Sequence, residues 1–146
     1  MSYHTHTTLL FHCVFASKSR VPSIPEDLQL RLWAYMGGIA RTNSMKALAV
    51  GGIADHSHIL LSLPPTITIA KAVQLVKAGS SKWIHEQTKS RRFEWQEGYG
   101  AFTIGASQVP ATVRYIDNQP ARHKKISLKE EWEMFLRRHA PFLNRD

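Results

Sequence analysis

The sequence of 146 residues contains a single cysteine, Cys13. One thiol cannot form an intrachain disulfide, which excludes the cross-linked framework of small secreted domains and is typical of a reducing compartment. The chain also lacks any apolar run close to the roughly 18 residues of a membrane-spanning helix. Its first residues, MSYHTHTT, have neither the basic nor the apolar region of a signal peptide. We therefore expect a soluble cytoplasmic protein that does not contact a membrane.

Acidic residues are scarce, because 11 Asp and Glu stand against 19 Lys and Arg and give a formal net charge of +8. This imbalance makes a polyanion the first partner to consider, with nucleic acid as the leading candidate. Charge alone does not separate DNA from RNA or from an anionic membrane. Glycine-rich phosphate loops are also lacking, since Gly51-Gly52 and Gly98-Tyr99-Gly100 have the wrong spacing for a nucleotide-binding motif and favour turns.

No internal repeat or linker interrupts the pattern, so residues 1–146 are expected to form one domain. Alternation and apolar periodicity predict four strands and four helices. The predicted strands are 3–15, 45–53, 58–63 and 100–104, and the predicted helices are 23–43, 69–84, 110–119 and 127–136. Strand, helix, paired strands, helix and strand is the order of the ferredoxin-like or RRM-like α+β fold. It predicts an antiparallel sheet of about four strands with the helices on one face.

Two histidines, His56 and His58, form an H-x-H pair in an extended stretch of the chain. Residues i and i+2 of an extended chain project to the same face, so the two imidazoles can offer nitrogen ligands to one divalent metal. Asp55 is close enough to accept a hydrogen bond from a ring N–H and orient it. Histidine is also a common surface residue, so the pair needs further support.

Tyr115 and Gln119 offer that support, because residues four apart share one face of a helix. Gln119 can give a neutral oxygen ligand to a hard cation. Tyr115 can supply a phenolate nucleophile if a metal and nearby Arg or Lys lower its pKa from about 10. Spacing alone favours the alternative of a half-buried tyrosine that packs on the core beside a solvated glutamine, because aromatic residues at helical spacing usually pack.

Two other groups of residues compete for a chemical role. His4 and His6 form a second H-x-H pair, but a position so near the N-terminus favours an exposed strand face. Cys13 follows His12, and neighbouring residues of a strand face opposite sides, so a Cys–His nucleophile pair is not expected. Cys13 is predicted to lie in the core.

Three sequence blocks follow one another along the chain: DHSHILLSLPP at 55–65, WQEGYGAF at 95–102 and YIDNQ at 115–119. Together they are more specific for a protein family than any one of them. On these blocks the sequence resembles the small single-tyrosine transposases of the HUH endonuclease superfamily. Such transposases are carried by the smallest bacterial insertion sequences, and the group includes domesticated relatives. The resemblance spans most of the chain.

The resemblance implies that His56 and His58 are paired metal ligands, that Gln119 is the third ligand, and that Tyr115 is the nucleophile. In this family the tyrosine attacks a phosphodiester of single-stranded DNA and leaves a 5′-phosphotyrosine and a free 3′-hydroxyl. Bound Mg²⁺, or Mn²⁺, polarises the phosphoryl oxygen. The family also implies a homodimer that binds the hairpin-forming ends of the element.

The chain departs from the family pattern at two places. Ser57 stands where a hydrophobic residue is usual, and it is predicted to point to the core side, away from the histidines. Ala121-Arg122-His123 replaces a frequent His-His pair, which leaves the role of that pair open. Basic residues near the tyrosine are candidate phosphate contacts, although a solvated basic face is the alternative. These residues are Arg114, Arg122, Lys124 and Lys125.

Three other functions stay open. An RNA-recognition module of the same fold stacks bases on aromatic side chains of its sheet, and 45–53 and 58–63 contain none. A hydrolytic phosphodiesterase could use His6 and His58 as acid and base without a tyrosine. A domesticated relative could bind DNA hairpins without catalysis, which the intact histidines, tyrosine and glutamine argue against.

Overall fold

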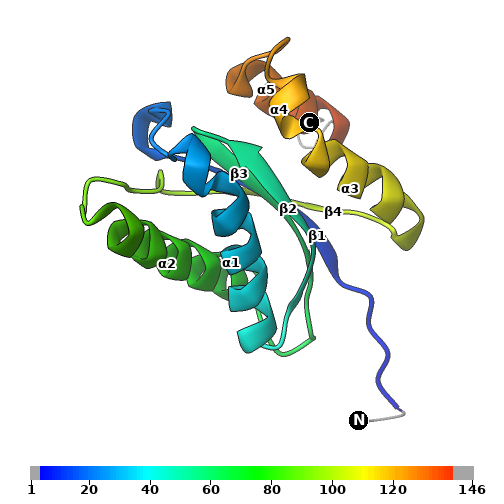
Figure 1. The fold of residues 1–146 in the computed structure, drawn as a ribbon. Helices are drawn as coiled ribbons and strands as arrows, with labels where there is room; N and C mark the ends of the chain where they lie inside the picture. Colours follow the sequence, from blue (N-terminus) through cyan, green and yellow to red (C-terminus); the bar gives the residue numbers. More distant parts are fainter. Residues whose placement is uncertain (1–3, 140–146) are drawn as a thin grey trace.

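The computed structural model describes residues 4–139 and contains an antiparallel sheet in the order β2-β3-β1-β4 (Figure 1). The strands are β1 (Leu10–Ala16), β2 (Lys46–Ile53), β3 (His56–Ser62) and β4 (Gly100–Thr103). The predicted α+β fold is thereby confirmed. The predicted first strand was too long: Tyr3 lies outside the described residues, and β1 starts only at Leu10, which pairs with Ser62 at the end of β3. The following Pro64-Pro65 offers no backbone N–H to continue the ladder.

The helices lie on both faces of this sheet, so the prediction that they share one face is wrong. Figure 1 shows α1 and α2 on one face and α3, α4 and α5 on the other. The reason is visible in β3, where Ile59, Leu60 and Leu61 are consecutive and all fully buried. Consecutive strand residues face opposite sides, and both sides therefore need a cover. The helices are α1 (Gln29–Thr42), α2 (Ile69–Thr88), α3 (Val109–Asp117), α4 (Gln119–Arg122) and α5 (Leu128–His139).

The main apolar core lies between the sheet and the α1–α2 layer, where Leu32, Met36 and Val76 pack against Ile59. Cys13 belongs to this core, as predicted, and burial raises the pKa of its thiol to about 12. Its neighbours on β1 face the opposite layer. Within the described residues, no helix is both long and apolar enough to cross a membrane.

Local sequence signals place the starts of α2, α3 and α5 within one residue, but not every helix end, since α2 continues to Thr88 and α5 to His139. The Ser127 hydroxyl accepts a hydrogen bond from the Glu130 backbone N–H at 3.1 Å, as the predicted cap of α5 requires. Ser23 does not cap α1, because its hydroxyl donates instead to the Val21 carbonyl at 3.1 Å. The helix predicted over 110–119 is interrupted at Asn118, and Pro120 lies in the first turn of α4, where its missing N–H costs little.

Gly51 lets α3 approach β2 closely. A Cβ at Gly51 would lie 2.5 Å from the Ile116 carbonyl oxygen, which is too close for any residue but glycine. We expect Gly51→Ala to lower the free energy of unfolding by about 1–3 kcal/mol, measured by urea denaturation. Gly37→Ala on α1 is the matched control, because a Cβ there would have no atom of residues 4–139 within 4 Å beyond its own helix backbone and chain neighbours. It should raise stability by up to about 1 kcal/mol. Equal effects of the two changes would contradict the close approach.

Candidate active site

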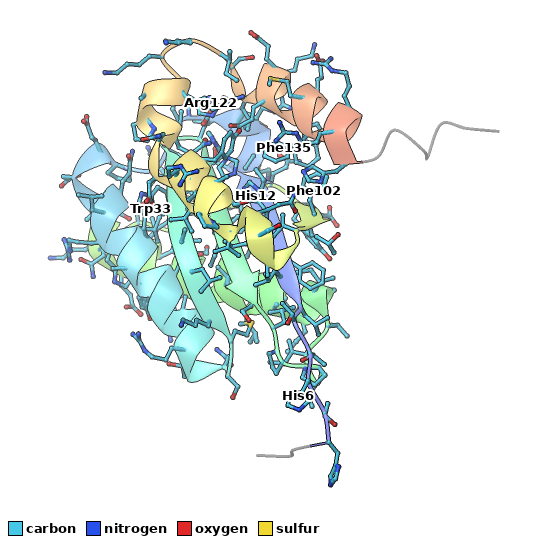
Figure 2. The ribbon with its side chains drawn as sticks, turned by 90° about the vertical axis from the view of Figure 1, so that its right-hand side faces the viewer. His6, His12, Trp33, Phe102, Arg122 and Phe135 are labelled. Atoms are coloured by element: carbon cyan, nitrogen blue, oxygen red, sulfur yellow. The ribbon has the colours of Figure 1, made fainter. Side chains whose placement is uncertain are left out.

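Polar side chains from distant parts of the chain converge on the sheet face that α3, α4 and α5 cover. His56 and His58 come from β3, Tyr115 from α3, Gln119 from the start of α4, and Glu131 from α5. Figure 2 shows His12, Arg122 and Phe135 gathered at this face, whereas His6 lies apart on the N-terminal arm. The four residues singled out in the sequence are therefore brought together, and the His6–His58 pair is not.

His56 is fully buried and held at both ring nitrogens. Its Nδ1 donates to Asp55 Oδ1 at 2.7 Å, which leaves Nε2 facing Gln119 Oε1 at 2.9 Å. The Gln119 amide nitrogen donates to Glu131 Oε2 at 3.0 Å, so its oxygen is the atom turned to the histidine. A ring whose proton lies on Nδ1 presents Nε2 as an acceptor, so two acceptors face one another and a cation between them would satisfy both.

His58 also has a neighbour at each of its two ring nitrogens. Its Nδ1 lies 2.8 Å from Nε2 of the buried His12, and its Nε2 lies 3.0 Å from Glu131 Oε1. Burial lowers the pKa of His12 to about 3 and that of His58 to about 4, so both rings are neutral at physiological pH. His12 thus fixes the ring orientation of His58, a role that the sequence did not reveal.

Glu131 is the centre of the cluster and was also missed in the sequence. The carboxylate is 1% exposed and accepts hydrogen bonds from Tyr115 and Gln119. His123 Nε2 and Arg122 Nε lie 3.3 Å and 3.5 Å from its oxygens. Burial alone would raise the pKa of Glu131, but the hydrogen bonds from neighbouring groups, among them His58 and Tyr115, outweigh it and hold the pKa well below its usual range.

Tyr115 is half-buried, with its hydroxyl donating to Glu131 Oε2. Its ring lies edge-on to His58 at 5.7 Å between centroids, and the Arg122 guanidinium carbon lies 4.8 Å from the ring centroid. Burial, the hydrogen bond to Glu131 and the charge of that carboxylate raise the pKa of Tyr115 above its ordinary value, although Arg122 acts to lower it. Gln119 is fully buried, so a solvated glutamine is excluded.

The remaining residues singled out in the sequence lie in three different places. Ser57 points away from the histidines, as predicted, and its hydroxyl donates to the Gly51 carbonyl at 3.1 Å. Arg122 faces the cluster. Arg114, Lys124 and Lys125 are exposed, so they can meet a ligand only from the outside.

The cluster has the donor set of a metal site. Ligand atoms of His56, His58, His123 and Glu131 all lie within 4.8 Å of one another. Among the residues that the structure describes, His123 Nε2 and Arg122 Nε are buried without a hydrogen-bond partner, and the imidazole nitrogen of His123 is directed at the same carboxylate. Mixed imidazole and carboxylate donors suit a divalent cation. The group can hold a metal ion, and His123 joins it although the sequence left its role open.

Comparison with known proteins identifies the family. Residues 5–119 match the family described as IS200-like transposases, which is well over half of the chain. The chain belongs to the IS200-like transposase family. This confirms the resemblance to single-tyrosine transposases of the HUH superfamily, and it makes the protein a DNA transposase, an enzyme that processes DNA.

Curated relatives and solved structures agree with this assignment. The transposase for insertion sequence element IS200 of Salmonella typhimurium strain LT2 is 26% identical over 108 residues, covering 70% of this chain and 71% of its own. The Salmonella typhi transposase for the same element has the same values. A crystal structure of a Deinococcus radiodurans R1 protein described as a transposase has a TM-score of 0.65 and 21% identity, covering 82% of this chain and 96% of its own.

A second solved structure is a REP-associated tyrosine transposase bound to a REP hairpin. It has a TM-score of 0.58 and 16% identity, and the likeness covers 86% of the IS200-like chain and 76% of the other. At these identities the two solved structures show a common fold. They place the four-stranded sheet and its helices among the known transposase folds.

Proposed function

We propose that this IS200-like transposase cleaves and rejoins single-stranded DNA through a covalent bond between Tyr115 and the 5′-phosphate of the cleaved strand. The observation that carries the proposal is the position of the Tyr115 hydroxyl. It is hydrogen-bonded to Glu131 within a cluster that also holds His56, His58 and Gln119. A tyrosine that only packed on the core would not need buried imidazoles and a buried carboxylate around its hydroxyl.

Nε2 of His56, Nε2 of His58 and Oε1 of Gln119 would hold Mg²⁺ or Mn²⁺, with Glu131 and His123 beside them. When bound, such an ion supplies Lewis-acid polarisation of a phosphoryl oxygen. The protein contributes the orientation of the ligands. Asp55 fixes the ring of His56, and His12 does the same for the second histidine.

The reaction requires the Tyr115 proton to leave as the phenolic oxygen attacks phosphorus. Glu131 Oε2 already accepts the hydrogen bond from that hydroxyl. It would take the proton once His58 Nε2 holds the metal ion instead of donating to this carboxylate, because the hydrogen bond from His58 is one of those that lower the pKa of Glu131. The bond between phosphorus and the 3′-oxygen breaks, and the leaving oxygen takes a proton from water to become a 3′-hydroxyl. In the reverse direction the hydroxyl attacks the phosphotyrosine, so rejoining needs no nucleotide cofactor. Arg122 lies beside both groups and can balance the negative charge that develops on the phosphate.

The proposed partners follow from charge and from one relative. Exposed Arg114, Lys124 and Lys125 at the edge of the site are the proposed phosphate contacts of single-stranded DNA. The REP-associated relative bound to a REP hairpin supports hairpin-forming element ends as the target. We further propose a homodimer in the cytoplasm.

Two alternative functions find less support. An RNA-recognition module uses an open sheet face, but α3, α4 and α5 cover the face on which His56 and His58 lie (Figure 1). A phosphodiesterase that pairs His6 with His58 would need them in one site, and Figure 2 places His6 on the N-terminal arm.

A denaturing gel tests the proposal directly. The protein is incubated with labelled single-stranded DNA from the flanks of its own gene, with Mg²⁺ or with EDTA. We expect a labelled band that migrates with the protein, survives denaturation and requires the metal. Cleavage to two free DNA fragments without such a band would overturn the covalent mechanism, because water would then be the nucleophile.

His12 offers a test of ligand orientation. We expect His12→Phe, which keeps an aromatic ring but removes the nitrogen 2.8 Å from His58, to weaken Mn²⁺ binding about 10- to 100-fold in calorimetric titration. His85→Phe on α2 is the matched control, since the His85 ring bonds the Phe93 carbonyl on the other side of the sheet. Unchanged Mn²⁺ affinity in His12→Phe would contradict the orienting role.

A further inference from the structure

A pocket of about 460 Å³ lies beside the catalytic cluster and takes no part in the chemistry described so far. Val14 and Ala16 of β1 line it, and in the sheet register Val14 pairs with His58 and Ala16 with His56. Paired residues of antiparallel strands project to the same face. The pocket therefore opens on the face of the two histidines, one strand spacing of about 4.8 Å to the side.

Two aromatic side chains, Trp132 and Tyr99, line this pocket. Trp132 of α5 lies over Gly100 so closely that a Cβ there would be 2.6 Å from the indole. The absence of a side chain at Gly100 is what allows the indole to lie against the strand. Tyr99 also lines the pocket and is 39% exposed. A pocket lined by aromatic side chains is suited to a planar ring, which can stack on them.

The rim of the pocket is held in a fixed shape by the chain around it. Ser19 and Arg20 have φ values of 56° and 55°, a left-handed conformation that is costly for residues other than glycine and concentrates at functional sites. The Ser19 backbone N–H donates to Gln96 Oε1 at 2.8 Å. Lys77 Nζ donates to the carbonyls of Gln96 and Gly98 at 2.7 Å and 2.8 Å. This bracing keeps the exposed Arg20 at the mouth of the pocket.

We propose that the pocket between Trp132, Tyr99 and Arg20 binds one unpaired base of the DNA strand, from a nucleotide next to the phosphate that Tyr115 attacks. This rests on the proposed function. The base stacks on the aromatic walls, and Arg20 pairs with the sugar–phosphate backbone at the mouth. The pocket lies one strand away from the histidines, so it adjoins the reacting phosphate without overlapping it.

The test combines a modified DNA with a modified pocket. The DNA is a set of single-stranded oligonucleotides from the gene's own flanks, each with one abasic site at a different nucleotide. The protein carries Tyr115→Phe, so that it does not cleave the DNA. Fluorescence anisotropy measures the binding. At one position the abasic site should weaken binding about tenfold. Adding Trp132→Ala should weaken binding of the intact oligonucleotide by a similar factor and remove its sensitivity to that abasic site.

Two further variants keep the test decisive. Gly100→Ala keeps Trp132 but displaces its indole with a methyl group, and it should cause the same loss of binding. It replaces Trp132→Ala in the test if that variant does not fold. Trp83→Ala on α2, outside the pocket, should retain the abasic sensitivity. Undiminished abasic sensitivity in both Trp132→Ala and Gly100→Ala, or no sensitive position at all, would overturn the base pocket.

The adduct assay with unmodified DNA and the intact tyrosine separates this inference from the proposed function. A covalent band without coupling between the abasic site and Trp132 overturns the pocket alone. Coupling without a covalent band overturns the mechanism alone and leaves the pocket standing. Failure to bind single-stranded DNA overturns both.

Discussion

Tyr115→Phe is expected to abolish the covalent protein–DNA band and to lower the rate of strand cleavage at least about a thousandfold. The substitution removes only the phenolic oxygen, the atom proposed to attack phosphorus and the donor of the hydrogen bond to Glu131. The ring and its edge-on contact with His58 remain. Binding of single-stranded DNA should therefore persist. Single-turnover cleavage followed on denaturing gels measures the rate, and anisotropy measures the binding.

Tyr35→Phe is the matched control for this experiment. Tyr35 lies on α1, on the other face of the sheet, with its ring stacked on Trp83 at 5.5 Å between centroids. Its loss of a hydroxyl should leave both adduct and cleavage at the level of the unmodified protein. A covalent band that survives in Tyr115→Phe would move the nucleophile to another residue. Cleavage that survives without a band would assign the attack to water.

The sequence was sufficient for the parts of the site that depend on local geometry. His56 and His58 share a strand face because strand side chains alternate, and Asp55 reaches the first ring because it is the adjacent residue. Tyr115 and Gln119 are four apart, and both contact the same Glu131 oxygen although the helix between them is interrupted at Asn118. The prediction that Tyr115 and Gln119 reach the same point therefore holds, although the predicted continuous helix does not.

The parts that the sequence did not reveal depend on how distant elements dock. Glu131 meets His58 across 73 positions of the chain, and that contact exists only because α5 packs on the second face of the sheet. One signal was present: Glu131 lies between Leu128 and Phe135 on the apolar stripe of α5, where a carboxylate is buried only if it has partners. The two-sided burial of β3 was also readable, from its consecutive residues Ile59, Leu60 and Leu61.

Glu131→Ala is expected to destabilise the metal-free protein by about 3–5 kcal/mol, the usual cost of removing one partner from a buried charged network. Three hydrogen-bonding groups would lose their common acceptor, namely Tyr115, Gln119 and His58. Arg122 would lose its carboxylate partner in a partly buried place. For a domain of this size the loss corresponds to a melting temperature lower by roughly 10 °C. Calorimetry at neutral pH in the presence of EDTA measures it.

Glu133→Ala separates the buried network from a general effect of removing acid from α5. Glu133 is exposed two residues further along the same helix, so its removal should change stability by no more than about 0.5 kcal/mol. Glu131→Gln keeps the side-chain shape but cannot take the tyrosine proton as a carboxylate does. We expect it to slow adduct formation about 10²- to 10⁴-fold. Normal adduct formation by Glu131→Gln would show that the Tyr115 proton leaves by another route and that Glu131 serves the fold alone.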